Sequence, residues 1–246
     1  MKKLAAFLTP ATLLVLALPA LADPTFVDTT FNLSDYTITK SLQSGTATVS
    51  QSAAGGNPGS ALFVDFVVPA SPPFTTTYGN VYYLNNGFTY DPAASGALSS
   101  IGWSIDRKVT IVQPANFGLV NGQTFLLFQS GKYYTAGISL PGTQGVYLTA
   151  SVTTSFSDFS LVTDMAVGTV NNTLHPSFAA GLIQFGFRNG YAIGPQTAAE
   201  LQDLQDNFSV TLNPAVAAVP EPETYAMLLV GLGLLASTGA RRRRGR

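Results

Sequence analysis

Leu98–Val112 reads LSSIGWSIDRKVTIV and shows the clearest alternation of apolar and polar residues in the chain. Ile101, Trp103 and Ile105 fall on one face, whereas the residues between them are glycine or polar. Successive side chains of a strand point to opposite faces, so a period of two predicts a strand here. One apolar face and one polar face are typical of an antiparallel sheet that packs on a core on one side only. We therefore expect Trp103 in the core.

Shorter strand-like runs recur on both sides of this stretch, separated by clusters rich in Gly, Pro and Asn. They are Phe31–Thr39, Thr46–Ser50, Ala61–Val68, Tyr78–Leu84, Phe88–Tyr90, Phe125–Phe128, Lys132–Thr135, Val146–Thr154, Ile183–Phe187 and Asp206–Leu212. Asn85-Asn86-Gly87 favours a hairpin turn between two of them, because Asn and Gly accept positive φ. Thr197–Asp206 is the one helix candidate. So many short strands predict an all-β fold, a two-sheet antiparallel β-sandwich of the jelly-roll type over residues 23–212.

The two ends of the chain carry targeting signals rather than domain sequence. Met1-Lys2-Lys3 is basic, Leu4–Leu18 is mostly apolar, and Ala20-Leu21-Ala22 has the small residues that signal peptidase recognises. We predict a signal peptide over residues 1–22, cleaved between Ala22 and Asp23 by signal peptidase. The mature chain is then exported across the inner membrane. Residues 213–219, rich in Ala and Val, are interpreted as a linker to the C-terminal signal.

Residues 220–246 combine three different elements in a fixed order. Pro220-Glu221-Pro222-Glu223 comes first, and Thr224–Ala240 follows without a single charge. At about 1.5 Å per residue this run is a transmembrane helix at the short end of what spans a bilayer. The basic tail 241–246 begins with Arg241, Arg242, Arg243 and Arg244. Basic residues stay on the cytoplasmic side, so everything before Pro220 lies outside. An ordinary membrane anchor is the alternative, but it leaves Pro220-Glu221-Pro222 without explanation.

Together these elements resemble the PEP-CTERM sorting domain. The resemblance rests on Pro220, Glu221 and Pro222, the apolar helix and the arginine cluster, and it covers residues 220–246 only. It implies a membrane-anchored precursor that an exosortase-type membrane protease recognises and cuts. It also implies a final location in the cell envelope, on the surface or outside the cell. Proteins with this signal occur in Gram-negative bacteria that make extracellular polysaccharide.

The targeting segments hide the charge of the exported region. The chain has 12 basic and 13 acidic residues. Seven of the basic residues, Lys2, Lys3 and five tail arginines, lie in the targeting segments, and so do two of the acidic residues, Glu221 and Glu223. Residues 23–219 therefore carry five bases and eleven acids, a net charge of about −6. An acidic region with scattered bases excludes a nucleic-acid partner. The chain has no cysteine, so an exported domain of this kind depends on its apolar core.

A second resemblance concerns the exported region itself. Gly56-Asn57-Pro58-Gly59, Ser104-Ile105-Asp106 and Asp206-Asn207-Phe208 look similar to segments of carbohydrate-binding or lectin-like jelly rolls. The resemblance implies that Asp206 binds a structural calcium ion, helped by Asp28 or by carbonyl oxygens. Calcium takes six to eight oxygen ligands. The alternative is that Asp206 caps a turn or a helix end, and no other cofactor is expected.

Catalytic chemistry finds little support in the sequence. His175 is the single histidine, so it cannot build a zinc site in a chain without cysteine, and no nucleophile elbow surrounds the nearby Ser177. A glycosidase needs two positioned carboxylates, and no signature selects a pair among Asp65, Asp106, Asp158 and Asp164. Tyrosines that could stack on sugar rings occur at positions 78, 82, 83, 90, 133 and 134, although tyrosine is also a common strand former.

Two functions remain open at this stage. In the first, the chain is an exported, non-enzymatic protein of the cell envelope or extracellular matrix that binds extracellular polysaccharide. In the second, it is an exported glycan-active hydrolase whose carboxylates the sequence does not identify. The missing catalytic pattern favours the first.

Overall fold

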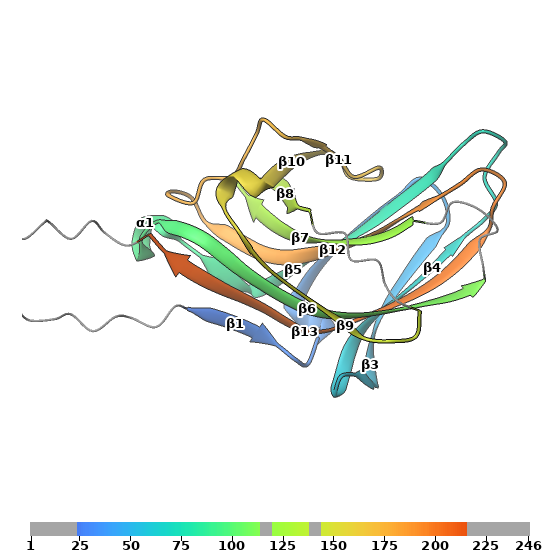
Figure 1. The fold of residues 1–246 in the computed structure, drawn as a ribbon, viewed down its shortest axis with the longest axis horizontal. Helices are drawn as coiled ribbons and strands as arrows, with labels where there is room; N and C mark the ends of the chain where they lie inside the picture. Colours follow the sequence, from blue (N-terminus) through green and yellow to red (C-terminus); the bar gives the residue numbers. More distant parts are fainter. Residues whose placement is uncertain (1–23, 114–119, 138–143, 216–246) are drawn as a thin grey trace, which may run out of the picture.

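The computed structural model describes residues 24–113, 120–137 and 144–215. They form two antiparallel sheets that pack face to face, and Figure 1 shows the sheets as two layers. The two-sheet antiparallel sandwich expected from the sequence is confirmed. The predicted signal peptide, the sorting residues and the arginine cluster all lie outside the described residues.

We call the two layers sheet A and sheet B. Sheet A runs in the order β3 (Thr46–Gly56), β4 (Gly59–Val68), β13 (Ala199–Pro214), β6 (Leu98–Gln113) and β9 (Leu148–Thr154), and β1 (Thr25–Asp28) also pairs with β13. Sheet B runs in the order β11 (Thr169–Asn171), β10 (Phe159–Asp164), β8 (Lys132–Ala136), β7 (Val120–Gln129), β12 (Ile183–Ile193), β5 (Thr77–Tyr90) and β2 (Tyr36–Leu42). Three short helical turns, Leu33–Asp35, α1 (Pro92–Ser95) and Phe156–Asp158, connect strands.

The apolar core lies between the sheets and is rich in aromatic side chains. Trp103, expected there, is 2% exposed and stacks on Phe125 with the ring centroids 4.9 Å apart. Its indole nitrogen donates to Thr154 Oγ1 at 2.7 Å, so its polar atom is also satisfied. Phe187 reaches the same core from β12 and packs on Phe208 of β13 at 5.1 Å. Burial of these large rings is the main stabilising contribution in a domain without disulfides.

The helix expected over Thr197–Asp206 is wrong. These residues lie within β13, which pairs with β4 on one edge and β6 on the other. Leu201 is fully buried between the sheets, whereas Leu204, three positions along, faces the other side. The local spacing of leucines is compatible with either structure, and pairing on both edges decides for the strand.

The hairpin turn expected at Asn85-Asn86-Gly87 is also wrong. β5 runs through these residues, and the register against β12 shifts between Gln184 and Gly186. The extra residues therefore form a bulge that keeps Phe88 and Tyr90 in the core, both 8% exposed. At the other end of the domain, β13 continues to Pro214, two residues past the expected boundary at 212.

Candidate functional site

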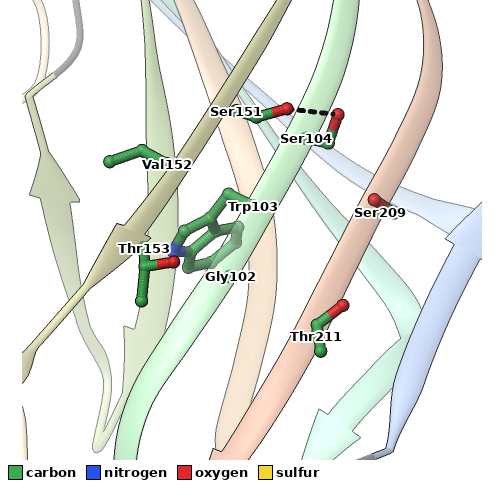
Figure 2. Close-up of a pocket in the computed structure, with 8 residues that line it drawn as sticks. All are labelled: Gly102, Trp103, Ser104, Ser151, Val152, Thr153, Ser209 and Thr211. Carbon is green, nitrogen blue, oxygen red and sulfur yellow. Dashed lines mark hydrogen bonds between the residues drawn. The ribbon is translucent and has the colours of Figure 1, made fainter.

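The outer face of sheet A carries a shallow groove lined by hydroxyl groups (Figure 2). The strand register explains how it forms. Ser209 of β13, Ser104 of β6 and Ser151 of β9 are direct partners in one row across the sheet. Thr211, Gly102 and Thr153 form the next row, so that a glycine lies between two threonines. We call the surface made by these six residues the hydroxyl face.

The hydroxyl face is open and has a volume of about 400 Å³. Figure 2 shows Ser151 and Ser104 directed at one another, and Ser151 Oγ donates to Ser104 Oγ at 3.1 Å. Its described lining contains no carboxylate, and Trp103 contributes from below while its indole lies in the core. Such a surface can exchange hydrogen bonds with a hydroxyl-rich ligand and offers no acid or base for catalysis.

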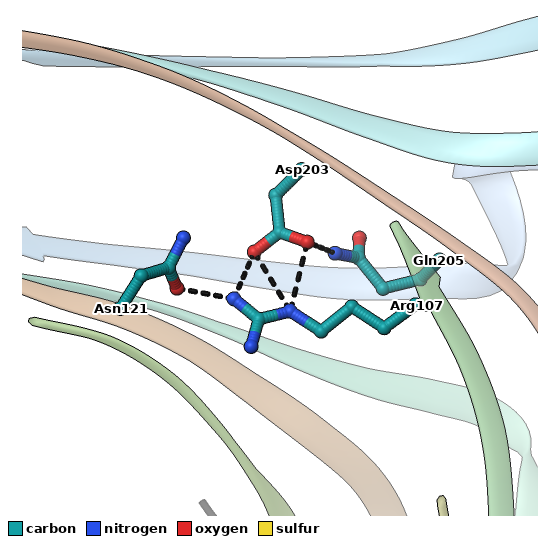
Figure 3. A network of polar contacts seen from close by, with 4 residues as sticks. All are labelled: Arg107, Asn121, Asp203 and Gln205. Atoms are coloured by element: carbon teal, nitrogen blue, oxygen red, sulfur yellow. Dashed lines mark hydrogen bonds and ion pairs between the residues drawn. The ribbon is translucent and has the colours of Figure 1, made fainter. Parts of the chain in front are cut away.

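A second polar cluster lies between the sheets. Arg107 follows Ile105 on the inward face of β6 and is 1% exposed. Its Nε donates to Asp203 Oδ1 at 2.9 Å, and its Nη2 lies 2.5 Å from Asp203 Oδ2. Figure 3 shows Gln205 and Asn121 on either side of this pair, and Gln205 Nε2 donates to Asp203 Oδ1 at 2.7 Å. Asn121 Oδ1 accepts from Arg107 and links the pair to β7 of the opposite sheet.

Several side chains near this ion pair have buried polar atoms without a partner. They are Tyr83 Oη, Asn121 Nδ2, Gln205 Oε1 and both amide atoms of Gln123 and of Asn189. Burial raises the pKa of Tyr83, and the Asp203 charge raises it further, which places the hydroxyl within the field of that carboxylate. Native interiors leave few buried polar groups unpaired. This cluster, which the sequence reasoning did not identify, is a polar interior suited to bound water.

Asp206, expected to bind calcium or to cap a turn, is fully buried beside Asp106 of the neighbouring strand. Its Oδ1 accepts from the Asn207 backbone N–H at 2.8 Å, and its Oδ2 accepts from the Asn57 N–H. Asp106 accepts from the Asn207 side chain at 2.8 Å and from Thr149 Oγ1. All four carboxylate oxygens therefore face donors, an arrangement that fits the capping role.

Asp28, the expected helper of Asp206, does not fit as a calcium ligand. Its Oδ1 accepts from the N–H groups of Thr30 and Phe31, each at 2.9 Å, and its Oδ2 accepts from Tyr36 Oη at 2.8 Å. Donors surround it instead of the oxygen ligands that calcium needs. Within residues 24–113, 120–137 and 144–215, no group of three or more His, Cys, Asp or Glu side chains could hold a metal. Calcium at Asp206 stays a prediction.

The tyrosines considered for sugar stacking are mostly buried. Tyr82 and Tyr83 point to opposite faces of β5, yet both are 0% exposed. The outer side chain, Tyr82, is covered because the turn after β10 folds over sheet B, and Tyr82 Oη donates to Met165 O at 2.8 Å. Tyr90 and Tyr134 are also buried, whereas Tyr78 and Tyr133 are half-buried.

Three of the other candidate catalytic groups hold local structure. Asp158 forms a capping box with Ser155, and Asp164 accepts from the Ala166 and Val167 N–H groups at 2.9 and 3.0 Å. His175 is anchored through Nδ1, which lies 2.6 Å from Phe159 O. Asp65 lies mid-strand in β4 with one buried oxygen that has no partner. The fold does not bring these groups to the hydroxyl face.

The C-terminal elements of the sequence match a known signal. Residues 218–244 match the PEP-CTERM protein-sorting motif. The PEP-CTERM motif marks an exported protein that is held by a C-terminal membrane anchor before processing and is then on the surface or outside the cell. It also implies processing by an exosortase. In the part of the chain with described coordinates, no helix has the length and apolar character to span a membrane.

Comparison of the fold finds weak likenesses to sugar-binding domains. One is a family 11 carbohydrate-binding module from Clostridium thermocellum in complex with a β-1,3-1,4-mixed-linked tetrasaccharide. It is 12% identical and has a TM-score of 0.39, and the match covers 80% of this chain and 98% of that chain. The CBM22-1 xylan-binding domain from Paenibacillus barcinonensis Xyn10C is 12% identical and has a TM-score of 0.40. The match covers 80% of this chain and 99% of that chain. Lectin UEA-II complexed with galactose is 16% identical and has a TM-score of 0.42. The match covers 78% of this chain and 100% of that chain. No curated protein matches the sequence.

Proposed function

We propose that the exported domain is a non-enzymatic polysaccharide-binding protein of the cell envelope or extracellular matrix, and that the hydroxyl face is its binding surface. The observation that carries the proposal is the pair of rows around Gly102. Hydroxyl side chains repeat across three strands on an outer sheet face that stays open as a groove.

The chemistry of the hydroxyl face suits a sugar chain. Neighbouring strands lie about 4.8 Å apart, so the three hydroxyl groups of the serine row recur at a regular spacing. Each hydroxyl both donates and accepts, which matches the hydroxyl groups of a polysaccharide. Gly102 leaves the centre of the groove free, because no side chain rises there between Thr211 and Thr153. The PEP-CTERM motif marks a protein of the cell surface or the outside of the cell, which supports an extracellular polymer as the ligand.

Filling the groove tests the proposal. A Cβ at Gly102 would lie 3.5 Å from Thr211 Cβ, an ordinary contact, so Gly102→Val is compatible with the strand and projects a side chain into the groove. Gly87→Val is the matched control, because Gly87 is an exposed strand glycine of sheet B whose added Cβ would also meet its nearest atom at 3.5 Å.

The experiment is co-sedimentation of the detergent-solubilised full chain with extracellular polysaccharide from the source bacterium. We expect the native chain and Gly87→Val to sediment with the polymer, and Gly102→Val to stay in solution. Equal retention of both variants, or no retention of the native chain, would remove the hydroxyl face from consideration. Release of reducing ends during the incubation would instead identify the alternative, a glycan-active hydrolase.

A further inference from the structure

Arg188 projects from the outer face of β12, on sheet B, the sheet opposite the hydroxyl face. The register places it in a row between Tyr82 of β5 and Thr124 of β7. In the next row, Gly190 lies between Asn80 and Gly122, and the Asn80 side chain lies over Gly190, where an added Cβ would be 2.0 Å from Asn80 Oδ1. A cavity of about 230 Å³ occupies this place, and we call it the Arg188 pocket. Its lining includes Tyr78, Asn80, Thr124, Val167, Arg188 and Gly190.

The turn after β10 forms one wall of the Arg188 pocket. Asn80 Nδ2 donates to Met165 O at 3.0 Å and to Ala166 O at 2.7 Å, which holds the turn against the sheet. Gly168 ends this turn at φ +77°, and an added Cβ there would lie 2.6 Å from Arg188 Nη1. The turn therefore closes over one side of the guanidinium and leaves the pocket on the other.

Two nitrogens of the guanidinium in this pocket have no hydrogen-bond partner. Nε and Nη1 of Arg188 are buried without a hydrogen bond, and so is Thr124 Oγ1 beside them. Among the described residues, no carboxylate lies within ion-pair distance of Arg188, in contrast to Arg107. Leaving such groups unpaired costs free energy, more so for a charged donor. Arg188 thus combines a positive charge, unused donors and an adjoining space.

We propose that the Arg188 pocket binds the carboxylate of an acidic sugar, such as a uronic acid. A guanidinium matches the planar geometry of a carboxylate. Thr124 and Tyr78 also line the pocket and would contact the remainder of the sugar. The volume is below the 300–1,000 Å³ usual for drug-sized ligands, so the pocket holds one small unit and not a long chain.

The pocket is independent of the hydroxyl face, because it lies on the other sheet. It adds a chemical class, an anionic sugar, that neutral hydroxyl recognition does not provide. The exported region is acidic, so general electrostatic attraction would not concentrate an anionic ligand there. Specific contacts with Arg188 must supply that recognition.

Titration calorimetry and thermal shift of the full chain in detergent, with sodium glucuronate as the probe, test the proposal. We expect saturable binding that raises the melting temperature, because a ligand that binds the folded state stabilises it. Glucose and acetate are the comparison ligands, the first without the carboxylate and the second without the sugar. Each should bind at least tenfold more weakly than glucuronate.

Variants complete the test. Arg188→Gln should remove glucuronate binding, and Thr124→Val, of nearly the same shape, should weaken it several-fold. Lys132→Gln, which removes an exposed base elsewhere on the domain, should bind as the native chain does. Gly102→Val should retain glucuronate binding, which separates this pocket from the proposed polysaccharide surface.

Several results would overturn the proposal. They are the absence of glucuronate binding, equal affinity for glucuronate and glucose, and unchanged affinity in Arg188→Gln. Equal affinity for acetate and glucuronate would show that the site takes a carboxylate without the sugar, which also contradicts it. If Arg188→Gln failed to fold, Thr124→Val would decide, because full affinity in that variant would exclude the pocket.

Discussion

Arg107 of β6 and Asp203 of β13 form an ion pair inside the sandwich, with both side chains 0–1% exposed. Three hydrogen bonds fix their geometry: Nε donates to Oδ1 at 2.9 Å and to Oδ2 at 3.1 Å, and Nη2 donates to Oδ2 at 2.5 Å. Removing one partner leaves an uncompensated buried charge, for which the cost is about 3–5 kcal/mol. We expect Arg107→Met and Asp203→Leu each to lower the free energy of unfolding by that amount.

The double variant Arg107→Met/Asp203→Leu provides the control for this pair. Replacing a buried ion pair by apolar residues of similar volume is often neutral or stabilising. We therefore expect the double variant to be more stable than either single variant, as measured by urea unfolding. If the two single losses simply add in the double variant, the pair does not act as a unit.

Alkaline pH should destabilise the domain through its buried tyrosines. Burial raises the pKa of Tyr191 to about 12, whereas a tyrosine in the unfolded chain titrates near 10. The folded state keeps its proton longer, so this contribution to stability is complete below about pH 10 and is lost between about pH 10 and 12. Urea unfolding at several pH values in this range measures the loss.

Tyr83 separates the effect of burial from that of a hydrogen bond. Its pKa is also raised by burial and by Asp203, and its hydroxyl has no partner. Tyr83→Phe should be neutral or stabilising at pH 7 and should lose less stability above pH 10. Tyr191→Phe should instead cost about 1 kcal/mol at pH 7, because Tyr191 Oη donates to Ser44 O at 2.7 Å. A large loss at pH 7 in Tyr83→Phe would show that its hydroxyl has a stabilising partner.

Gly186 allows β5 and β12 to approach where β5 bulges. A Cβ at Gly186 would lie 1.8 Å from the Tyr83 carbonyl oxygen, which is backbone and cannot rotate away. Gly186→Ala should therefore lower the free energy of unfolding by about 1–3 kcal/mol or more. Gly87→Ala, with 3.5 Å to its nearest atom, should change it little. Equal unfolding midpoints for the two variants would contradict the close approach.

Excess chelator distinguishes the two roles considered for Asp206. Because its oxygens accept the N–H groups of Asn57 and Asn207, we expect the melting temperature to be unchanged by chelator. Asp206→Ala should lower it in either condition, since two part-buried backbone donors lose their acceptor. A melting temperature that falls with chelator and recovers with calcium would establish the ion instead.

The C-terminus provides the test of sorting. Because residues 218–244 match the PEP-CTERM motif, we expect the mature protein from an exosortase-containing cell to lack the arginine cluster. Mass spectrometry of the C-terminal peptide measures this. Ala substitution of Pro220, Glu221 and Pro222 should leave the precursor uncut. A mature native protein that still ends in Arg246 would refute processing.

The alternation of apolar and polar residues predicts the sheets, but it does not predict the ion pair buried between them. The alternation that placed Ile101, Trp103 and Ile105 in the core also places Arg107 there, two residues further on. A charged residue is rarely buried without a partner, and the sequence around Arg107 does not show where that partner lies. Asp203 lies 96 positions away, and only pairing of β13 with β6 brings the two together.

The Arg188 pocket and the hydroxyl face could not be predicted because both depend on register. Gly190 and Gly122 are unremarkable in sequence, and they form a floor only because β12 and β7 place them side by side. The same holds for Ser209, Ser104 and Ser151, which come from three distant strands.

The sequence by itself determined the class of fold and the C-terminal sorting signal. Alternation with a period of two is a local property, and the PEP-CTERM elements are read in order along the chain, so both are visible without coordinates. Tertiary structure decided that 197–206 is strand, that Asn85-Asn86-Gly87 is a bulge, and which polar groups meet. These outcomes depend on which strands pair and in what register, and that is fixed by packing between residues far apart in the chain.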